Sequence, residues 1–176
     1  MGVETQTLDA PNTSLKVSDY VHLHNHTHHS LLDGLSKIPK LIETVQTLGM
    51  EAVAITDHGT MSGVLDFYKA ANAAGVKPIL GMEAYVAARS RHDRDPQKDK
   101  GRYHLIILAM NNTGYQNLMR LSTTANLEGM YYKPRIDREL LEKYNEGLII
   151  LSGCASSELG ENLRSDNYEE AKRIAT

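Results

Sequence analysis

The fold class follows from residues 52–81, which read AVAITDHGTMSGVLDFYKAANAAGVKPILG. The stretch opens with an apolar run at 52–56 and continues into residues 62–74, whose apolar side chains recur at helical spacing. Gly75 is typical of a helix end, and a second apolar run follows at 77–80. This order predicts a strand, a helix and a strand, the repeating unit of an α/β fold with a mostly parallel sheet.

The same alternation extends in both directions from this unit. Further strands are expected at 20–24, 83–87 (as an extension of 77–80), 103–109 and 148–151. Further helices are expected at 38–48, 113–127, 137–144 and 168–176. Between them, residues 89–102 hold six basic and three acidic side chains and almost nothing apolar, which predicts an exposed loop.

The composition limits the class of protein. The chain has 176 residues, of which 41% are apolar, so we expect a polar tail over 1–19 and one domain over 20–176. With a net charge of −3, the chain has no excess of basic residues of the kind expected in a protein that binds duplex DNA by itself. Cys154 is the only cysteine, which excludes an internal disulfide and favours a reducing compartment. No apolar run approaches the ~18 residues of a membrane helix, so we expect a cytoplasmic protein without a membrane partner.

Residues of the types that commonly bind metal ions lie next to the predicted strands. His22-Leu23-His24-Asn25-His26 and Thr56-Asp57-His58 lie at the ends of the first two strands, and Glu83, His104 and Cys154 adjoin the later ones. Because the ends of successive strands in α/β folds converge on one face, we expect these residues to meet. Neutral imidazoles bind divalent ions well, and a shared carboxylate can bridge two ions for phosphoryl chemistry. The pattern therefore predicts a polynuclear metal site on a barrel-like scaffold.

Each of these residues also has an ordinary explanation when taken alone. Asp57 and Asp33 are typical of turns that precede glycine, and Glu83 is a common kind of surface carboxylate. His104 alone is a half-buried histidine, and Cys154 alone a small core residue. Their shared position at strand ends favours the functional interpretation.

Five motifs together resemble the polymerase and histidinol phosphatase (PHP) domain family. They are His22-Leu23-His24-Asn25-His26-Thr27, Ser30-Leu31-Leu32-Asp33-Gly34, Ile55-Thr56-Asp57-His58-Gly59, Lys77-Pro78-Ile79-Leu80-Gly81-Met82-Glu83-Ala84-Tyr85 and Leu151-Ser152-Gly153-Cys154. Residues 112–118 and 133–137 are similar to the branch carried by bacterial replicative DNA polymerase III alpha subunits. The resemblance covers the chain from about Tyr20 to its end.

The resemblance implies a distorted seven-stranded β/α barrel, similar to a TIM barrel, with up to three divalent ions, Zn²⁺ or Mn²⁺. In family members with intact ligands it implies a 3′ to 5′ exonuclease that proofreads DNA. The implied ligands are His24, His26, Asp33, His58, Glu83, His104 and Cys154. His22 and Asp57 are expected to support them, and Cys154 stands where phosphatase relatives carry a histidine.

Two family features have no counterpart here. The last metal motif, an aspartate and a histidine on a late strand, is missing, so the chain is expected to hold roughly the first two thirds of the domain. The catalytic aspartates of a polymerase are also missing, so we do not expect this chain to synthesise DNA by itself. The implied partners are the 3′ end of DNA, the remaining polymerase domains and other replisome subunits.

Basic residues are predicted to hold backbone phosphates near the metal site. The candidates are Arg89, Arg91, Arg102, Lys133 and Arg135, although a solvated charged loop explains any one of them equally well. Two other functions compete with the exonuclease. One is a small-molecule phosphoesterase of the histidinol phosphatase type, and the other is a metal-stabilised platform that braces a polymerase or docks a proofreading subunit.

Overall fold

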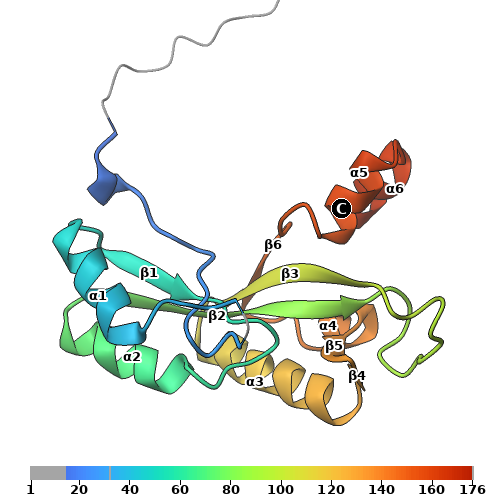
Figure 1. The fold of residues 1–176 in the computed structure, drawn as a ribbon, viewed down its shortest axis with the longest axis horizontal. Helices are drawn as coiled ribbons and strands as arrows, with labels where there is room; N and C mark the ends of the chain where they lie inside the picture. Colours follow the sequence, from blue (N-terminus) through green and yellow to red (C-terminus); the bar gives the residue numbers. More distant parts are fainter. Residues whose placement is uncertain (1–14, 32, 176) are drawn as a thin grey trace, which may run out of the picture.

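The computed structural model describes residues 15–31 and 33–175 and shows one mixed sheet with helices packed against it (Figure 1). The strands are β1 (Ala52–Ile55), β2 (Lys77–Ala87), β3 (Arg102–Ala109), β4 (Met130–Tyr131), β5 (Lys133–Ile136) and β6 (Leu148–Leu151). The helices are the 3₁₀ turn η1 (Val17–Asp19), α1 (Ile38–Thr47), α2 (Val64–Ala73), α3 (Asn112–Leu127), α4 (Arg138–Lys143), α5 (Glu158–Arg164) and α6 (Tyr168–Ala175). Most of the predicted tail at 1–19 lies outside the described residues.

Strand β2 is the centre of the sheet. Its first half pairs in parallel with β1, and from Gly81 onward it pairs antiparallel with β3 on the opposite side. Near its end β2 also pairs in parallel with β5, while β6 adds to β3 in the antiparallel direction. The predicted mostly parallel sheet is therefore wrong. A parallel neighbour needs a long crossover, usually a helix, whereas the segment between β2 and β3 is a loop that returns the chain directly.

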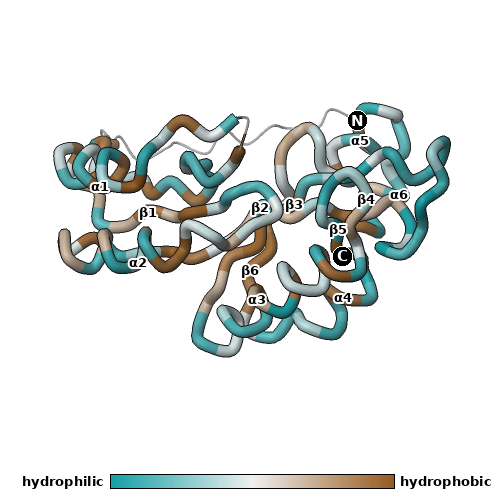
Figure 2. Tube along the Cα trace, turned by 60° about the horizontal axis from the view of Figure 1, so that its bottom comes forward, coloured by the Kyte–Doolittle hydropathy of each residue, from teal (hydrophilic) through white to brown (hydrophobic). Residues whose placement is uncertain are grey.

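Two apolar clusters hold the helices to the sheet. Helices α1 and α2 pack on β1 through a cluster that includes Ile42, Val53, Ile55 and Phe67. Helix α3 packs on β2 and β3 through a second cluster, centred on Leu118 and including the side chain of Met82. The tube in Figure 2 shows the hydrophobic colour concentrated along the strands, with polar colour on the outer turns of the helices.

Most predicted elements agree with the structure to within two residues, but the strand expected at 20–24 is wrong. Only His22 forms a bridge there, with Val53 of β1. Next to this single bridge, the Asn25 side chain donates hydrogen bonds to the carbonyls of His22 and Ala54 at 3.2 Å each. The elements β4, β5 and α5 were not predicted. The sequence of β5, Lys133-Pro134-Arg135-Ile136, carries a proline and two charges that argue against a strand, and β4 and α5 hold too few apolar residues for a period to stand out.

The charged segment 89–102 is a loop, but it is not exposed throughout as expected. Arg91 and Asp99 are only 7% and 2% exposed. Arg91 pairs with Asp137 at 3.0 Å, and Asp99 pairs with Arg89 at 2.6 Å. The fully buried Arg135 donates to backbone carbonyls of the same loop, including Asp93 at 2.8 Å. Internal ion pairs that join distant segments are the reason that a charge run does not predict exposure here.

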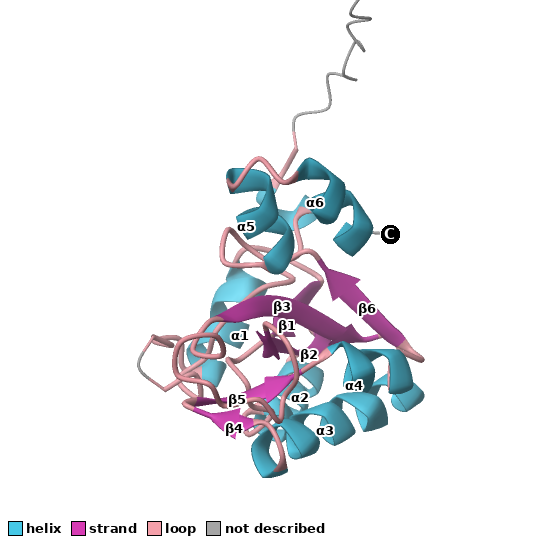
Figure 3. Cartoon of the chain, turned by 90° about the vertical axis from the view of Figure 1, so that its right-hand side faces the viewer, coloured by secondary structure: helices cyan, strands magenta, loops and turns pink. Residues whose placement is uncertain are grey.

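Helices α5 and α6 pack against each other beyond the end of β6 (Figure 3). Strand β6 pairs only with β3 among the described residues. No helix in the described part of the chain is long and apolar enough to cross a membrane.

Candidate metal centre

Glu83 is the centre of the candidate site. It lies on β2, is 1% exposed, and directs both carboxylate oxygens at imidazole rings. One oxygen, Oε2, lies 2.7 Å from His24 Nε2, 2.8 Å from His26 Nε2 and 3.5 Å from His58 Nδ1. The other oxygen, Oε1, lies 2.7 Å from His104 Nδ1. Four imidazoles from separate segments therefore converge on one buried carboxylate.

These five side chains form two groups that share Glu83. His24, His26 and Glu83 make one, and His58, Glu83 and His104 make the other, with all ligand atoms of a group within 4.8 Å of one another. Imidazole and carboxylate donors suit Zn²⁺ and Mn²⁺. The Nδ1 atom of His58 is buried and has no hydrogen-bond partner, a cost that a bound cation would remove. The residues present thus fit divalent metal ions.

The chain brings the ligands together through backbone pairing. The loop that carries His24 and His26 runs beside β1, where Thr56 donates its N–H to the Asn25 carbonyl at 2.9 Å. His58 lies just after β1 and forms a parallel bridge with Glu83. His104 lies near the start of β3, and because β3 is antiparallel to β2, the start of β3 meets the end of β2. The structure therefore brings these residues together although the strand directions were predicted wrongly.

The electrostatics of the cluster favour a charged carboxylate at Glu83 and act in opposite directions on His26 and His58. Burial pushes the pKa of Glu83 upward, but hydrogen bonds from His104, His26 and His24 outweigh it and hold that pKa far below its usual range. The hydrogen bond to Glu83 raises the pKa of His26. Burial lowers the pKa of His58, whose ring stacks on that of His26 with centroids 4.1 Å apart. Of these two stacked rings beside Glu83, His26 therefore binds a proton more readily than His58.

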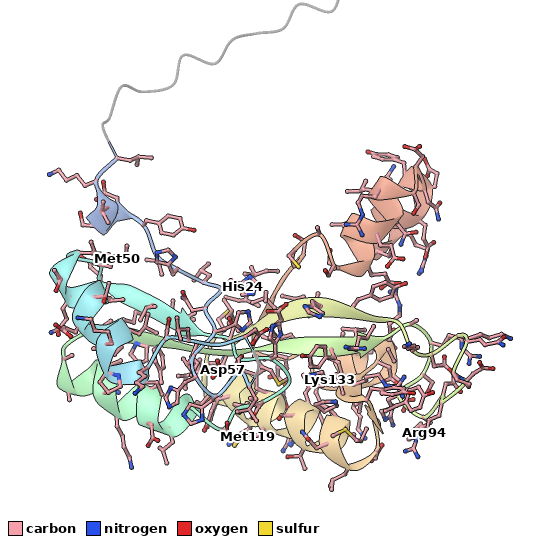
Figure 4. All side chains as sticks on the ribbon, in the orientation of Figure 1. His24, Met50, Asp57, Arg94, Met119 and Lys133 are labelled. Carbon is pink, nitrogen blue, oxygen red and sulfur yellow. The ribbon has the colours of Figure 1, made fainter. Side chains whose placement is uncertain are left out.

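Asp33 and Asp57 both lie next to the cluster but contact different groups. The Asp33 carboxylate lies 2.7 Å from His58 Nε2, although the Asp33 side chain is about half exposed. Asp57 is buried and accepts hydrogen bonds from the Thr27 N–H at 2.6 Å and the Thr27 hydroxyl at 2.8 Å. Figure 4 shows His24 and Asp57 above and below the middle of the sheet. Asp33 therefore contacts a ligand side chain, whereas Asp57 ties down the loop that carries the ligands.

Two of the expected site residues lie outside the cluster. The Cys154 thiol is exposed, accepts the Ser156 N–H at 3.4 Å, and belongs to neither ligand group. The His22 ring lies against Tyr20, with centroids 4.7 Å apart, and does not reach Glu83. The His22 main chain nevertheless anchors the ligand loop, because its carbonyl accepts the Ala54 N–H at 2.9 Å.

The five basic candidates separate into two sets. Arg89, Arg91 and Arg135 are committed to the ion pairs and carbonyl contacts that hold the 89–102 loop. Arg102 and Lys133 instead approach the ring of Tyr85, at 5.5 and 5.6 Å from its centroid.

Tyr85 itself was missed from the sequence. Its ring stacks beside His58, with centroids 5.7 Å apart, and meets His104 edge-on at 5.2 Å. Tyr85 lies two positions after Glu83 on one strand, so period-two alternation was a signal that could have placed both on the same face. Ser30 and Thr27 were also missed, since nothing local marks a serine or threonine as a partner of distant Asp57.

Comparison with known proteins identifies the family. The profile of the PHP domain family matches residues 22–176. The chain belongs to the PHP domain family. It is 52% identical over 157 residues to the DNA polymerase III subunit alpha of Treponema pallidum, and 51% identical over 157 residues to that of Thermus aquaticus. These matches cover 89% and 87% of this PHP chain, which spans only 13% of each relative's length.

Among solved structures, an amidohydrolase from Chromobacterium violaceum aligns with a TM-score of 0.42 and 20% identity. The alignment covers 59% of this chain and 34% of that one.

Proposed function

We propose that this PHP domain is a metal-dependent phosphodiesterase that removes nucleotides from the 3′ end of DNA. The observation that carries the proposal is Glu83, a buried carboxylate shared by two groups of imidazoles. A carboxylate between two cation positions is the arrangement used by two-metal phosphoryl-transfer sites. Similarity to DNA polymerase III alpha subunits favours DNA over a phosphomonoester as the substrate.

Each ligand has a separate task in this proposal. His24, His26 and Glu83 would hold one ion, and His58, Glu83 and His104 would hold the other. Bound divalent ions supply Lewis-acid polarisation of the phosphate and activation of water.

Asp33 is proposed as a further oxygen ligand, because its exposed carboxylate already contacts His58. We do not retain Cys154, whose exposed thiol lies outside both groups.

Arg102 and Lys133 are proposed to hold the substrate phosphates. Both approach the ring of Tyr85, and neither forms an ion pair with a carboxylate among the described residues, in contrast to Arg89 and Arg91. Cations without an anionic partner are suited to bind phosphate, because the charge-assisted hydrogen bonds to it replace no existing ion pair. We do not retain Arg89, Arg91 or Arg135, because their donors are already used within the protein.

The wider setting is also a proposal. The domain is placed in a cytoplasmic replicative polymerase, with DNA, the remaining polymerase domains and replisome subunits as partners, since its relatives are DNA polymerase III alpha subunits. The sheet is proposed to form part of a seven-stranded β/α barrel. Exposed Ile149 and Ile150 on β6 support this, because an apolar edge strand is stabilised by a further neighbour.

The test measures metal content and nuclease activity together. We expect the wild-type chain to retain zinc or manganese after desalting and to shorten a 3′ recessed DNA strand. A His24→Ala, His26→Ala double variant should lose metal, and its nuclease rate should fall at least about 100-fold, since outer-shell changes alone cost ~10–100-fold.

His28→Ala, His92→Ala is the matched control, because both rings lie outside the ligand groups. A double variant with lower thermal stability but unchanged nuclease rate would favour the structural platform. Hydrolysis of a phosphomonoester with none of DNA would favour the small-molecule phosphoesterase.

A further inference from the structure

Ser30 lies between the metal-type cluster and the buried carboxylate of Asp57. The Ser30 side chain is 1% exposed, and its hydroxyl oxygen contacts three polar groups. The hydroxyl donates to Asp57 Oδ1 at 3.2 Å and accepts the backbone N–H of His58 at 2.9 Å. The third contact is His26 Nδ1, at 3.2 Å. Ser30 therefore touches two ligand residues at once without being a ligand.

The number of protons and lone pairs at Ser30 decides the direction of the third hydrogen bond. A hydroxyl has one hydrogen and two lone pairs. The hydrogen is given to Asp57, and one lone pair is used by the His58 N–H, which can only donate. The remaining lone pair faces His26 Nδ1, so that nitrogen must carry a hydrogen to bond with it. One hydrogen of the His26 ring is thereby assigned to Nδ1, and the proton that bonds to Glu83 and gives way to a metal ion is the one on Nε2.

This assignment leaves the other ring nitrogen for the site. His26 Nε2 is the atom that faces Glu83 Oε2, at 2.8 Å. A histidine binds a metal ion through an unprotonated nitrogen, and the hydrogen bond made by its other nitrogen selects which one that is. Asp57 acts on His26 only through Ser30, because Asp57 orients the Ser30 hydroxyl and is itself held by Thr27.

We propose that Ser30 is a positioning residue that holds the His26 Nδ1–H and so presents Nε2 to a divalent ion. This inference rests on the proposed metal site. It predicts that loss of one buried hydroxyl, which is no ligand, weakens metal binding by allowing the His26 ring to turn and its proton to move.

The test reads the His26 proton first, without metal. In the metal-free wild-type chain, long-range ¹⁵N–¹H correlation spectra should show a His26 Nδ1–H that exchanges slowly with water. In Ser30→Ala this proton should exchange at least about 10-fold faster, because its acceptor is gone. Ser62→Ala is the matched control, since the Ser62 hydroxyl makes a similar contact with His29 Nδ1 at 3.3 Å outside the cluster.

Zinc affinity is measured next by competition with a chromophoric chelator. Ser30→Ala should bind Zn²⁺ about 10–100-fold more weakly than wild type, the range found for outer-shell partners, while Ser62→Ala stays within twofold. A wild-type His26 without a protected Nδ1–H would overturn the inference even if Ser30→Ala failed to fold. Unchanged zinc affinity in a folded Ser30→Ala chain would also overturn it. Failure of wild type to bind zinc, with the proton protected, would instead count against the proposed function alone.

Discussion

At the scale of single residues, the protonation of the cluster depends on Glu83. A buried carboxylate is costly unless it is paired, and this one is contacted by His24, His26 and His104 within 2.8 Å. The same contacts affect the histidines unequally, because the pKa of His26 is raised while burial lowers that of His58. His26 therefore keeps its proton to a higher pH than His58 does.

The difference between the pKa shifts of His26 and His58 predicts that zinc binding releases a proton from His26. A zinc ion at Nε2 must displace the proton present below the raised pKa, so zinc affinity should fall as the pH decreases through that pKa, which lies above the ordinary value of about 6.5. His58 is already neutral in this range and contributes no such release. Calorimetry in two buffers of different ionisation enthalpy measures the released protons.

His26→Gln should abolish the release just above pH ~6.5, whereas His92→Gln should preserve it. Equal proton release in wild type and His26→Gln would show that the proton comes from elsewhere.

At the scale of secondary-structure elements, the turn after β1 brings His58 to Glu83. Gly59 in this turn has a φ of +62° and donates its N–H to the Glu83 carbonyl at 2.9 Å. A Cβ at Gly59 would lie 2.9 Å from Pro134 Cγ and 3.1 Å from the Tyr85 ring. The turn is therefore restricted both by its backbone conformation and by close packing against β2 and β5.

Gly59→Ala is expected to destabilise the chain more than Gly75→Ala. Gly75 has a similar φ of +72°, but a Cβ added there would meet no atom within 4 Å, so this position isolates the conformational cost of about 1–2 kcal/mol. Gly59→Ala adds the overpacking cost of roughly 1–3 kcal/mol and should also shift Tyr85. Urea unfolding measures both variants, and equal losses would show that the contacts around Gly59 relax freely.

At the scale of the whole molecule, a metal ion at the proposed site would join segments that are distant in sequence. The five ligand side chains come from the loop before α1, the turn after β1, and strands β2 and β3. The ligand loop is otherwise attached to the sheet by one bridge and a few hydrogen bonds. A bound ion should therefore stabilise the fold as well as act on a substrate.

Thermal unfolding should report this stabilisation. Zinc at 100 times its Kd adds about 2.7 kcal/mol, which corresponds to a rise in Tm of roughly 5–10 °C for a chain of this size. Addition of EDTA should reverse the rise, and the His24→Ala, His26→Ala variant should show a smaller one. A Tm unaffected by zinc would indicate that no preformed site exists in the folded chain.

The local pattern of the sequence predicted helices α1, α2, α3, α4 and α6, four of the strands and the residues that gather at Glu83. The spacing of apolar residues depends only on neighbours a few positions away, so it locates helices and strands. Once the strands are located, the histidines and carboxylates next to their ends can be read from the sequence. The mixture of imidazoles and carboxylates also predicted a shared carboxylate, which agrees with the two groups of possible ligands that share Glu83.

The direction of β3, the burial of Arg91 and Arg135, and the contacts of Ser30 were decided only by the tertiary structure. Each depends on a partner far along the chain: β2 for β3, Asp137 for Arg91, Asp57 for Ser30. A charged or hydroxyl side chain is predicted to be exposed unless its partner is known, because such a side chain is buried at acceptable cost only when it is paired. Local sequence thus determined which residues could bind metal, while long-range pairing decided which protons and charges surround them.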